Sequence, residues 1–226
     1  MKTYENPFHR GHLYIQIEDE DLYDGIVQKI EDLFQGNKRP LQTSVSSDES
    51  ECIRLLLESG FLLKRKCYEM NVCRSDLLLA LEKNPNELLK AEKGSETYAA
   101  CAEMMFRYYA LTHASVNPLT ASLEEFTYIL PSSAVYTETN GVIGAVAFIE
   151  KNEIAYLASD SPKDLPSFLA SLLERMFAKY DYIFFEADDV DPAAMSLMNM
   201  FSKRPTVSFD TYVKTRGYGA ADSSVS

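Results

Sequence analysis

The sequence predicts an α+β fold around a mixed β-sheet, and three observations support this class. Each end of the chain shows the order strand, helix, strand, helix, strand. In the helical stretches, apolar residues recur at i, i+3 and i+4, the spacing of one helix face. Between the two ends, residues 133–159 alternate across two turn signals and predict a three-strand meander. Strands that alternate with helices, joined to a meander, indicate a mixed sheet covered by helices.

Five elements are predicted at the beginning of the chain and five at its end. The first set comprises a strand at 12–17, a helix at 21–34, a strand from Leu41, a helix around Cys52 and Leu55, and a strand at 61–72. The second set comprises a strand at 153–159, a helix at 164–177, a strand at 182–186, a helix around Ala194 and Leu197, and a strand at 207–216. The sets align at a nearly constant offset, because Leu41 matches Ile183 at a shift of 142 positions and Asp21 matches Asp164 at 143. This offset predicts an internal duplication.

The middle of the chain has no counterpart in the first set. Residues 87–98 are polar and predict a connector, which a helix follows. Ser122 begins a Ser-x-x-Glu capping box, which predicts another helix start. Asn140-Gly141 is the favoured two-residue hairpin turn, and residues 151–152 predict a second turn in the meander.

Composition and charge narrow the function classes. No apolar stretch reaches the ~20 residues of a membrane helix, and no basic-then-apolar leader opens the sequence, so we expect a cytoplasmic protein without a membrane partner. The net charge of -12 argues against nucleic acid, because Lys and Arg must neutralise phosphates, and favours a cationic small molecule or a basic protein. His9 and His12 have a spacing that some metal sites use, but no third ligand follows. We therefore expect no metal and place both histidines at the surface.

From residue 95 to 216 the predicted order is two helices, a three-strand meander, a helix, a strand, a helix and a strand. This order resembles the GNAT superfamily of N-acetyltransferases. The beginning of the chain resembles the C-terminal half of the same fold, with Gly60-Phe61 after the helix as in many GNAT proteins. The resemblance implies a GNAT-like fold that is duplicated in part. Its implied divisions are a partial unit at 1–86, a connector at 87–98, a near-complete unit at 99–216 and a flexible tail at 217–226.

The resemblance also implies an acetyl-CoA site. In this family the strands that correspond to 153–159 and 182–186 splay apart, and the cofactor pyrophosphate lies on the start of the helix between them. The implied cofactor-binding residues are Leu157, Ala158, Ser159, Ser161 and Lys163. The chain departs from the family's glycine-rich loop here, because "SDSPKDLPSF" at 159–168 has no glycine and two prolines, which supply no N–H. The matching stretch of the first unit, 18–25, is acidic and would repel a pyrophosphate.

The family's usual general acid, a tyrosine in the last helix, is missing, since Leu56 and Met198 stand at the aligned places. Tyr212 or Tyr156 is the candidate substitute, and the alternative is a strand tyrosine packed in the core. His113 follows the first helix of the second unit. The resemblance places that loop beside the acceptor pocket, where a neutral imidazole can act as a base. The alternative for His113 is a helix C-cap.

Four acids gather where the strand at 182–186 gives way to a helix. Asp188, Asp189 and Asp191 are expected to cap that helix, with Pro192 in its first turn. Glu186 ends the splayed strand, and the resemblance turns it toward the cleft, where a carboxylate can accept a proton or hold a cationic amine. Glu150 is a similar candidate, although a turn follows it directly.

The sequence therefore supports two functions. The first is acyl-CoA-dependent N-acyl transfer, with acetyl-CoA as the donor and an amine of a small molecule or protein as the acceptor. Glu186 or His113 would take the proton, and backbone N–H groups near 157–159 would polarise the carbonyl. The second is a non-catalytic GNAT-like binding or regulatory module, which the glycine-poor loop and the missing tyrosine favour. A homodimer would cover the open sheet edges and helix faces of such units.

Overall fold

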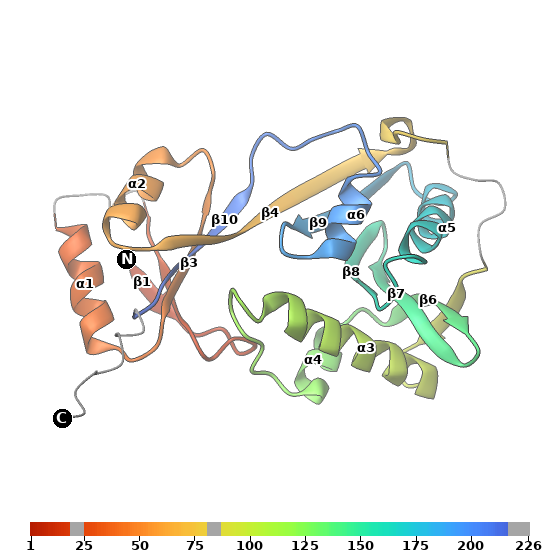
Figure 1. Cartoon of the computed structure of the whole chain (residues 1–226), viewed down its shortest axis with the longest axis horizontal. Coiled ribbons are helices and arrows are strands. Elements are labelled where there is room, and N and C mark those ends of the chain that lie inside the picture. The colour runs from red at the N-terminus through yellow and green to blue at the C-terminus, as the bar shows by residue number, and fades with distance from the viewer. Residues whose placement is uncertain (19–24, 81–86, 217–226) are drawn as a thin grey trace, which may run out of the picture.

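The computed structural model describes residues 1–18, 25–80 and 87–216 (Figure 1). The predictions for the acidic stretch beyond residue 18 and for the tail at 217–226 lie outside these ranges. The described strands are β1 Lys2–Tyr4, β2 Leu13–Gln16, β3 Leu41–Ser46, β4 Leu62–Cys73, β5 Leu89–Glu92, β6 Ser133–Thr139, β7 Val142–Glu150, β8 Glu153–Ser159, β9 Tyr182–Asp188 and β10 Phe209–Lys214. The described helices are α1 Ile26–Gly36, α2 Ser50–Glu58, the 3-10 helix η2 Arg74–Asp76, α3 Glu96–His113, α4 Leu123–Ile129, α5 Leu165–Phe177 and α6 Pro192–Met198.

All the described strands lie in one mixed sheet, which confirms the predicted fold class. Its strand order is β1-β2-β3-β10-β4-β9-β8-β7-β6-β5. The last strand of the chain, β10, pairs antiparallel with both β3 and β4 of the first unit. In turn β4 reaches across the molecule and pairs antiparallel with β9 of the second unit (Figure 1). Each unit therefore contributes its final strand to the other, and the two units share one continuous sheet.

The predicted order strand, helix, strand, helix, strand is confirmed at both ends of the chain. In each set the first two strands are parallel: β2 pairs with β3, and β8 pairs with β9. In α2 the buried residues include Cys52, Leu55 and Leu56, the face that the spacing predicts. A common ancestry of the two sets stays a prediction.

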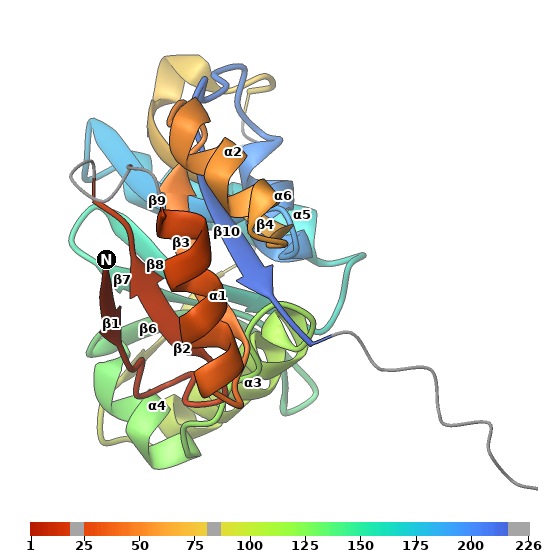
Figure 2. The same cartoon turned by 90° about the vertical axis from the view of Figure 1, so that its left-hand side faces the viewer.

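Three apolar cores hold the helices on the sheet. In the second unit, α5 and α6 pack on one face through residues such as Phe168 and Leu197, against strand residues that include Ala147. Helices α3 and α4 pack on the opposite face against Phe148, the neighbour of Ala147, because successive strand residues point to opposite faces. Figure 2 shows α1 and α2 in front of β2, β3 and β10, where they form the third core. Within the described ranges, no helix combines the length and apolar character needed to cross a membrane.

Local turn and cap signals are confirmed. Asn140 and Gly141 both have positive φ, 54° and 80°, as the two-residue turn between β6 and β7 requires. Lys151 forms the turn between β7 and β8 with φ 56°. Ser122 and Glu125 make the reciprocal hydrogen bonds of a capping box at the start of α4.

Residues 87–98 were predicted to be a polar connector, and this prediction is wrong because they form regular secondary structure. These residues contain β5, which pairs antiparallel with β6, and the first turn of α3. In β5 only Ala91 is buried, while its charged neighbours Lys90 and Glu92 face solvent. Exposed charged residues are typical of an edge strand. They are also typical of a linker, which is why the sequence of this strand predicts a connector.

Deletion of residues 207–216 is expected to abolish cooperative folding of the chain. The deletion removes the strand between β3 and β4, together with the buried Tyr212 and Val213. Burial of these two side chains alone contributes about 1.5–3 kcal/mol each, against a total stability of about 5–15 kcal/mol for a typical domain. Urea unfolding followed by circular dichroism measures the effect, with a chain ending at residue 216 as the control. A cooperative transition in the deleted chain would contradict the shared sheet.

Candidate functional site

The two parallel strands of the second unit pair only briefly. The register of β8 with β9 comprises Glu153 opposite Phe184 and Ile154 opposite Phe185. Beyond Ile154 no further pairs join the two strands, while the other edge of β9 pairs with β4 along its whole length. The predicted splay is therefore present, and the edge of β8 that faces β9 has no strand partner over its second half.

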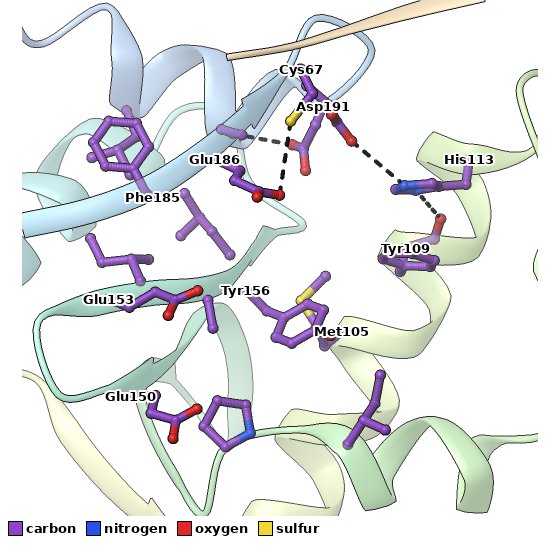
Figure 3. A pocket seen from close by; sticks show the side chains of 18 of the residues that line it. Cys67, Met105, Tyr109, His113, Glu150, Glu153, Tyr156, Phe185, Glu186 and Asp191 are labelled. Atoms are coloured by element: carbon purple, nitrogen blue, oxygen red, sulfur yellow. Dashed lines mark hydrogen bonds and ion pairs between the residues drawn. The ribbon is translucent and has the colours of Figure 1, made fainter. Parts of the chain in front are cut away.

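A cavity of about 470 Å³ lies at this separation, between β8, β9 and β4 on one side and α3 on the other (Figure 3). The ends of α4 and β7 and one face of α6 complete its wall. Its polar lining includes Arg65, Glu150, Glu153, Tyr156, Glu186 and Asp188. The cavity is thus built by both units, since β4 of the first unit supplies Arg65.

Four carboxylates in this cavity have no cationic partner among the described residues. Asp191 accepts hydrogen bonds from the hydroxyl of Tyr108 and from two N–H groups of α6, and the other three are Glu150, Glu153 and Glu186. Glu150 lies directly opposite Glu153 across β7 and β8. Glu153 pairs with Phe184, two residues before Glu186, so all three side chains share one face. Burial, followed by the nearby carboxylates of Asp188, Glu69 and Glu153, raises the pKa of Glu186. Like charges this close favour binding of a cation.

Arg65 and Asp188 form the ion pair of the cavity. Arg65 Nη1 donates to Asp188 Oδ2 at 2.9 Å, and the two side chains are only 17% and 18% exposed. The same Nη1 lies 3.0 Å from Nε2 of His113. An arginine N–H can only donate, so Nε2 accepts and the proton of the neutral ring sits on Nδ1, which donates to Tyr109 O at 3.1 Å.

His113 lines the cavity as predicted, but it is not available as the base. Its Nε2 lone pair is already taken by Arg65. Burial first, and then the positive charge of Arg65, lower the pKa of His113 to about 3. The imidazole therefore stays neutral and holds the guanidinium in place, and Glu186 is the better proton acceptor of the two predicted groups.

The acid-rich end of β9 divides into separate tasks. Asp191 caps α6, because its side chain accepts from the N–H groups of Ala193 and Ala194, as predicted. The capping prediction is wrong for the other two acids. Asp188 pairs with Arg65, and Asp189 Oδ1 accepts from Lys66 N at 2.9 Å. These two carboxylates fasten β4 of the first unit onto the second.

Tyr212 does not reach the cavity, so its prediction as a catalytic residue is wrong. Its side chain is 4% exposed and lies in the core of the first unit, because β10 is inserted between β3 and β4. Tyr156, the other tyrosine considered, lines the cavity, and burial raises the pKa of its hydroxyl. A neutral phenol there can donate a hydrogen bond or a proton.

The predicted cofactor residues lie in three different surroundings. Leu157 lines the cavity. Ala158 is fully buried in the core under α3. Ser159, the last residue of β8, lies outside the cavity. So do Ser161 and the exposed Lys163, which belong to the loop that leads from β8 to α5.

This loop does not fit a CoA pyrophosphate. Pro162 and Pro166 have no N–H. The N–H groups of Asp164 and Leu165 both donate to Ser161 O at 3.1 Å, so these two donors are already used within the loop. The exposed carboxylate of Asp164 at the start of α5 adds a charge that repels phosphate. The structure therefore agrees with the departure seen in the sequence.

His9 and His12 were expected at the surface, and this expectation is wrong. They are 3% and 8% exposed. His9 lies 3.1 Å from the hydroxyl of Tyr109, and His12 lies 2.8 Å from Gln42 Oε1. Burial lowers the pKa of both histidines, so they pack as neutral rings. No cluster of three metal-ligating side chains occurs among the described residues.

Neither Arg65 nor Glu153 could be recognised as a cavity residue from its sequence surroundings. Arg65 lies 123 positions from Asp188, and only the exchange of final strands brings them together. Glu153 is the first residue of an ordinary strand. Both become visible only when the register of β8, β9 and β4 is known.

The chain matches no family model and no curated protein by sequence. Among solved structures it is similar to a GCN5-related N-acetyltransferase from Kribbella flavida, with 14% identity, TM-score 0.55, and coverage of 94% of this chain and 84% of that one. It is also similar to a GCN5-related N-acetyltransferase from Sphaerobacter thermophilus, with 12% identity, a TM-score of 0.57, and coverage of 94% of this chain and 75% of that one. A third similar structure is a tandem GNAT protein from the clavulanic acid biosynthesis pathway, with 8% identity, a TM-score of 0.51, and coverage of 90% of this chain and 74% of that one. At these identities the fold is what the likeness establishes, and it is the acyl-CoA N-acyltransferase fold of GNAT proteins.

Proposed function

We propose that this GNAT-fold protein binds a small cationic amine in the cavity between β8 and β9. One observation carries the proposal: three carboxylates, Glu150, Glu153 and Glu186, converge on one cavity in which Arg65 is already paired with Asp188. A bound ammonium group supplies the missing positive charge. Hydrogen bonds to charged groups typically contribute about 1.5–3 kcal/mol each.

Acyl transfer to that amine, with an acyl-CoA such as acetyl-CoA as the donor, is the second candidate. The fold is that of N-acetyltransferases, and the separated strands leave the edge of β8 open beside the cavity. The pKa of Glu186 is raised toward neutral pH. A carboxylate with a higher pKa is a better proton acceptor for an ammonium group. Against this candidate stands the loop before α5, which offers no cradle for a pyrophosphate.

Titration calorimetry with butylamine and its neutral analogue butyramide tests amine binding. The two ligands are similar in size and differ in charge at pH 7. We expect butylamine to bind at least tenfold more tightly, because tenfold corresponds to about 1.4 kcal/mol and one charge-assisted hydrogen bond already contributes that much. Equal affinity, or no heat from either ligand, would refute the proposal.

Acetyl-CoA and CoA form the second arm of the experiment. If acetyl-CoA binds and releases free thiol only when butylamine is present, acyl transfer is the function. If neither compound gives heat or thiol while butylamine binds, the protein is an amine-binding module that keeps the fold without the transfer reaction. We expect the second result, since three N–H groups of the loop, those of Ser161, Asp164 and Leu165, are already bonded within it.

A further inference from the structure

A second hollow adjoins the cavity. It has a volume of about 400 Å³ and is lined by Pro7, Phe8, Glu124, Glu125, Tyr128 and Ile129. We call it the α4 groove. Ile129 also lines the cavity, so the two spaces meet at this residue. The cavity lining also includes the apolar side chains of Pro131, two residues after Ile129, and Met105.

The walls of the α4 groove are fixed in place. Thr120 N donates to Phe8 O at 2.8 Å, which holds the N-terminal segment against the loop that leads into α4. Arg10 N donates to Thr120 Oγ1 at 2.8 Å, and Arg10 Nη2 donates to Glu125 Oε1 at 2.6 Å. These contacts pre-form the groove, so a ligand need not order it on binding.

The charge of the groove differs from that of the cavity. Glu125 is neutralised by Arg10 and also accepts from Ser122 N. Glu124 is a second, exposed acid in the first turn of α4, and the other walls are apolar: Pro7, Phe8, Tyr128 and Ile129. Tyr128 is 82% exposed and Ile129 41% exposed, and Lys93 Nζ lies 5.7 Å from the centre of the Tyr128 ring. An ammonium group therefore gains by entering the cavity, whereas an apolar group gains by entering the groove.

We infer that the ligand of the cavity is an amine that carries an apolar substituent, with its ammonium group at Glu186 and its substituent passing Ile129 into the α4 groove. This inference rests on the proposed amine binding and names the class of amine. A compact hydrophilic amine would leave the apolar walls of Phe8 and Tyr128 in water. The shared residue Ile129 identifies the substituent of the same ligand, rather than a separate partner, as the occupant of the groove.

A homologous series of primary amines from ethylamine to hexylamine tests the inference by calorimetry. Burial of one methylene corresponds to about fourfold in affinity. We expect the dissociation constant to fall by about this factor for each added carbon once the chain passes Ile129. A dissociation constant that is flat along the series would overturn the inference, while amine binding itself would stand. Absence of binding by every amine would instead refute the proposed function.

Two variants locate the apolar contact. Tyr128→Ala, in the groove, is expected to lower the ratio of hexylamine to ethylamine affinity several-fold. Tyr182→Ala, at another exposed tyrosine outside both hollows, is expected to keep the wild-type ratio. Equal ratios in the two variants would overturn the inference. So would a dimer, seen by analytical ultracentrifugation, that Tyr128→Ala dissociates without any change in the ratio, because the groove would then hold a second copy of the chain.

Discussion

Glu186→Gln is expected to weaken butylamine binding by more than tenfold. The substitution keeps the size of the side chain and removes the carboxylate of β9 whose pKa is raised by burial and by its acidic neighbours. Loss of a charge-assisted hydrogen bond corresponds to about 1.5–3 kcal/mol, or roughly 10- to 150-fold in affinity. Titration calorimetry of the purified variant measures the change.

Glu138→Gln is the matched control for this prediction. Glu138 lies in β6, is exposed, and does not line the cavity. Its replacement changes the net charge by the same amount and should leave the affinity within about twofold, since exposed charges interact weakly through water. Equal losses in both variants would mean that general electrostatic attraction, and not a contact with Glu186, holds the amine.

The pH dependence of binding follows from the same carboxylate. The pKa of Glu186 is raised by burial and neighbouring acids, so its proton is lost at a higher pH than from an exposed glutamate. Only the ionised form attracts an ammonium group. Affinity for butylamine should therefore fall as pH decreases through this raised pKa, and the fall should be smaller in Glu186→Gln, which has no proton to gain at this position.

Local features of the fold could be predicted from the sequence because their causes are local. The turn at Asn140-Gly141 and the capping box at Ser122 depend on residues within four positions of each other. The faces of the helices follow from a spacing of three and four residues. The exchange of β4 and β10 has no such signal, because a strand carries no mark of which neighbour it will pair with. The burial of His9 was missed for the same reason, since Tyr109 lies 100 positions away.

The candidate site was predictable in location and less so in chemistry. The resemblance placed Glu186 and His113 at one cleft, and both line the cavity. His113, however, has no free lone pair, because its Nε2 accepts a hydrogen bond from Arg65, which comes from the other unit. A titratable residue can be placed by its element, but its protonation depends on the charges that distant elements bring to it. Tyr212 was misplaced because its strand belongs to the other half of the sheet.

Arg65→Met is expected to destabilise the protein by about 3 kcal/mol or more. Removal of the guanidinium leaves Asp188 with a mostly buried carboxylate and no cation, and breaking a buried ion pair from one side typically costs about 3–5 kcal/mol. Burial already raises the pKa of Asp188 above its usual range. The ionised form therefore opposes folding above that pKa, and protonation relieves the penalty below it. The destabilisation, measured by urea unfolding, should be larger at pH 8 than at pH 5.

A double-mutant cycle separates the ion pair from other contacts of Arg65. Arg65→Met combined with Asp188→Leu replaces both charges by apolar groups, so we expect it to recover most of the stability that Arg65→Met loses. Arg54→Met breaks an ion pair with Glu58 whose side chains are 57% and 51% exposed, and it should change the unfolding free energy by less than about 0.5 kcal/mol. If the effects at Arg65 and Asp188 simply add, this ion pair does not join the two units. In that case the backbone hydrogen bonds and apolar contacts of the exchanged strands hold β4 on β9, without a specific contribution from Arg65 and Asp188.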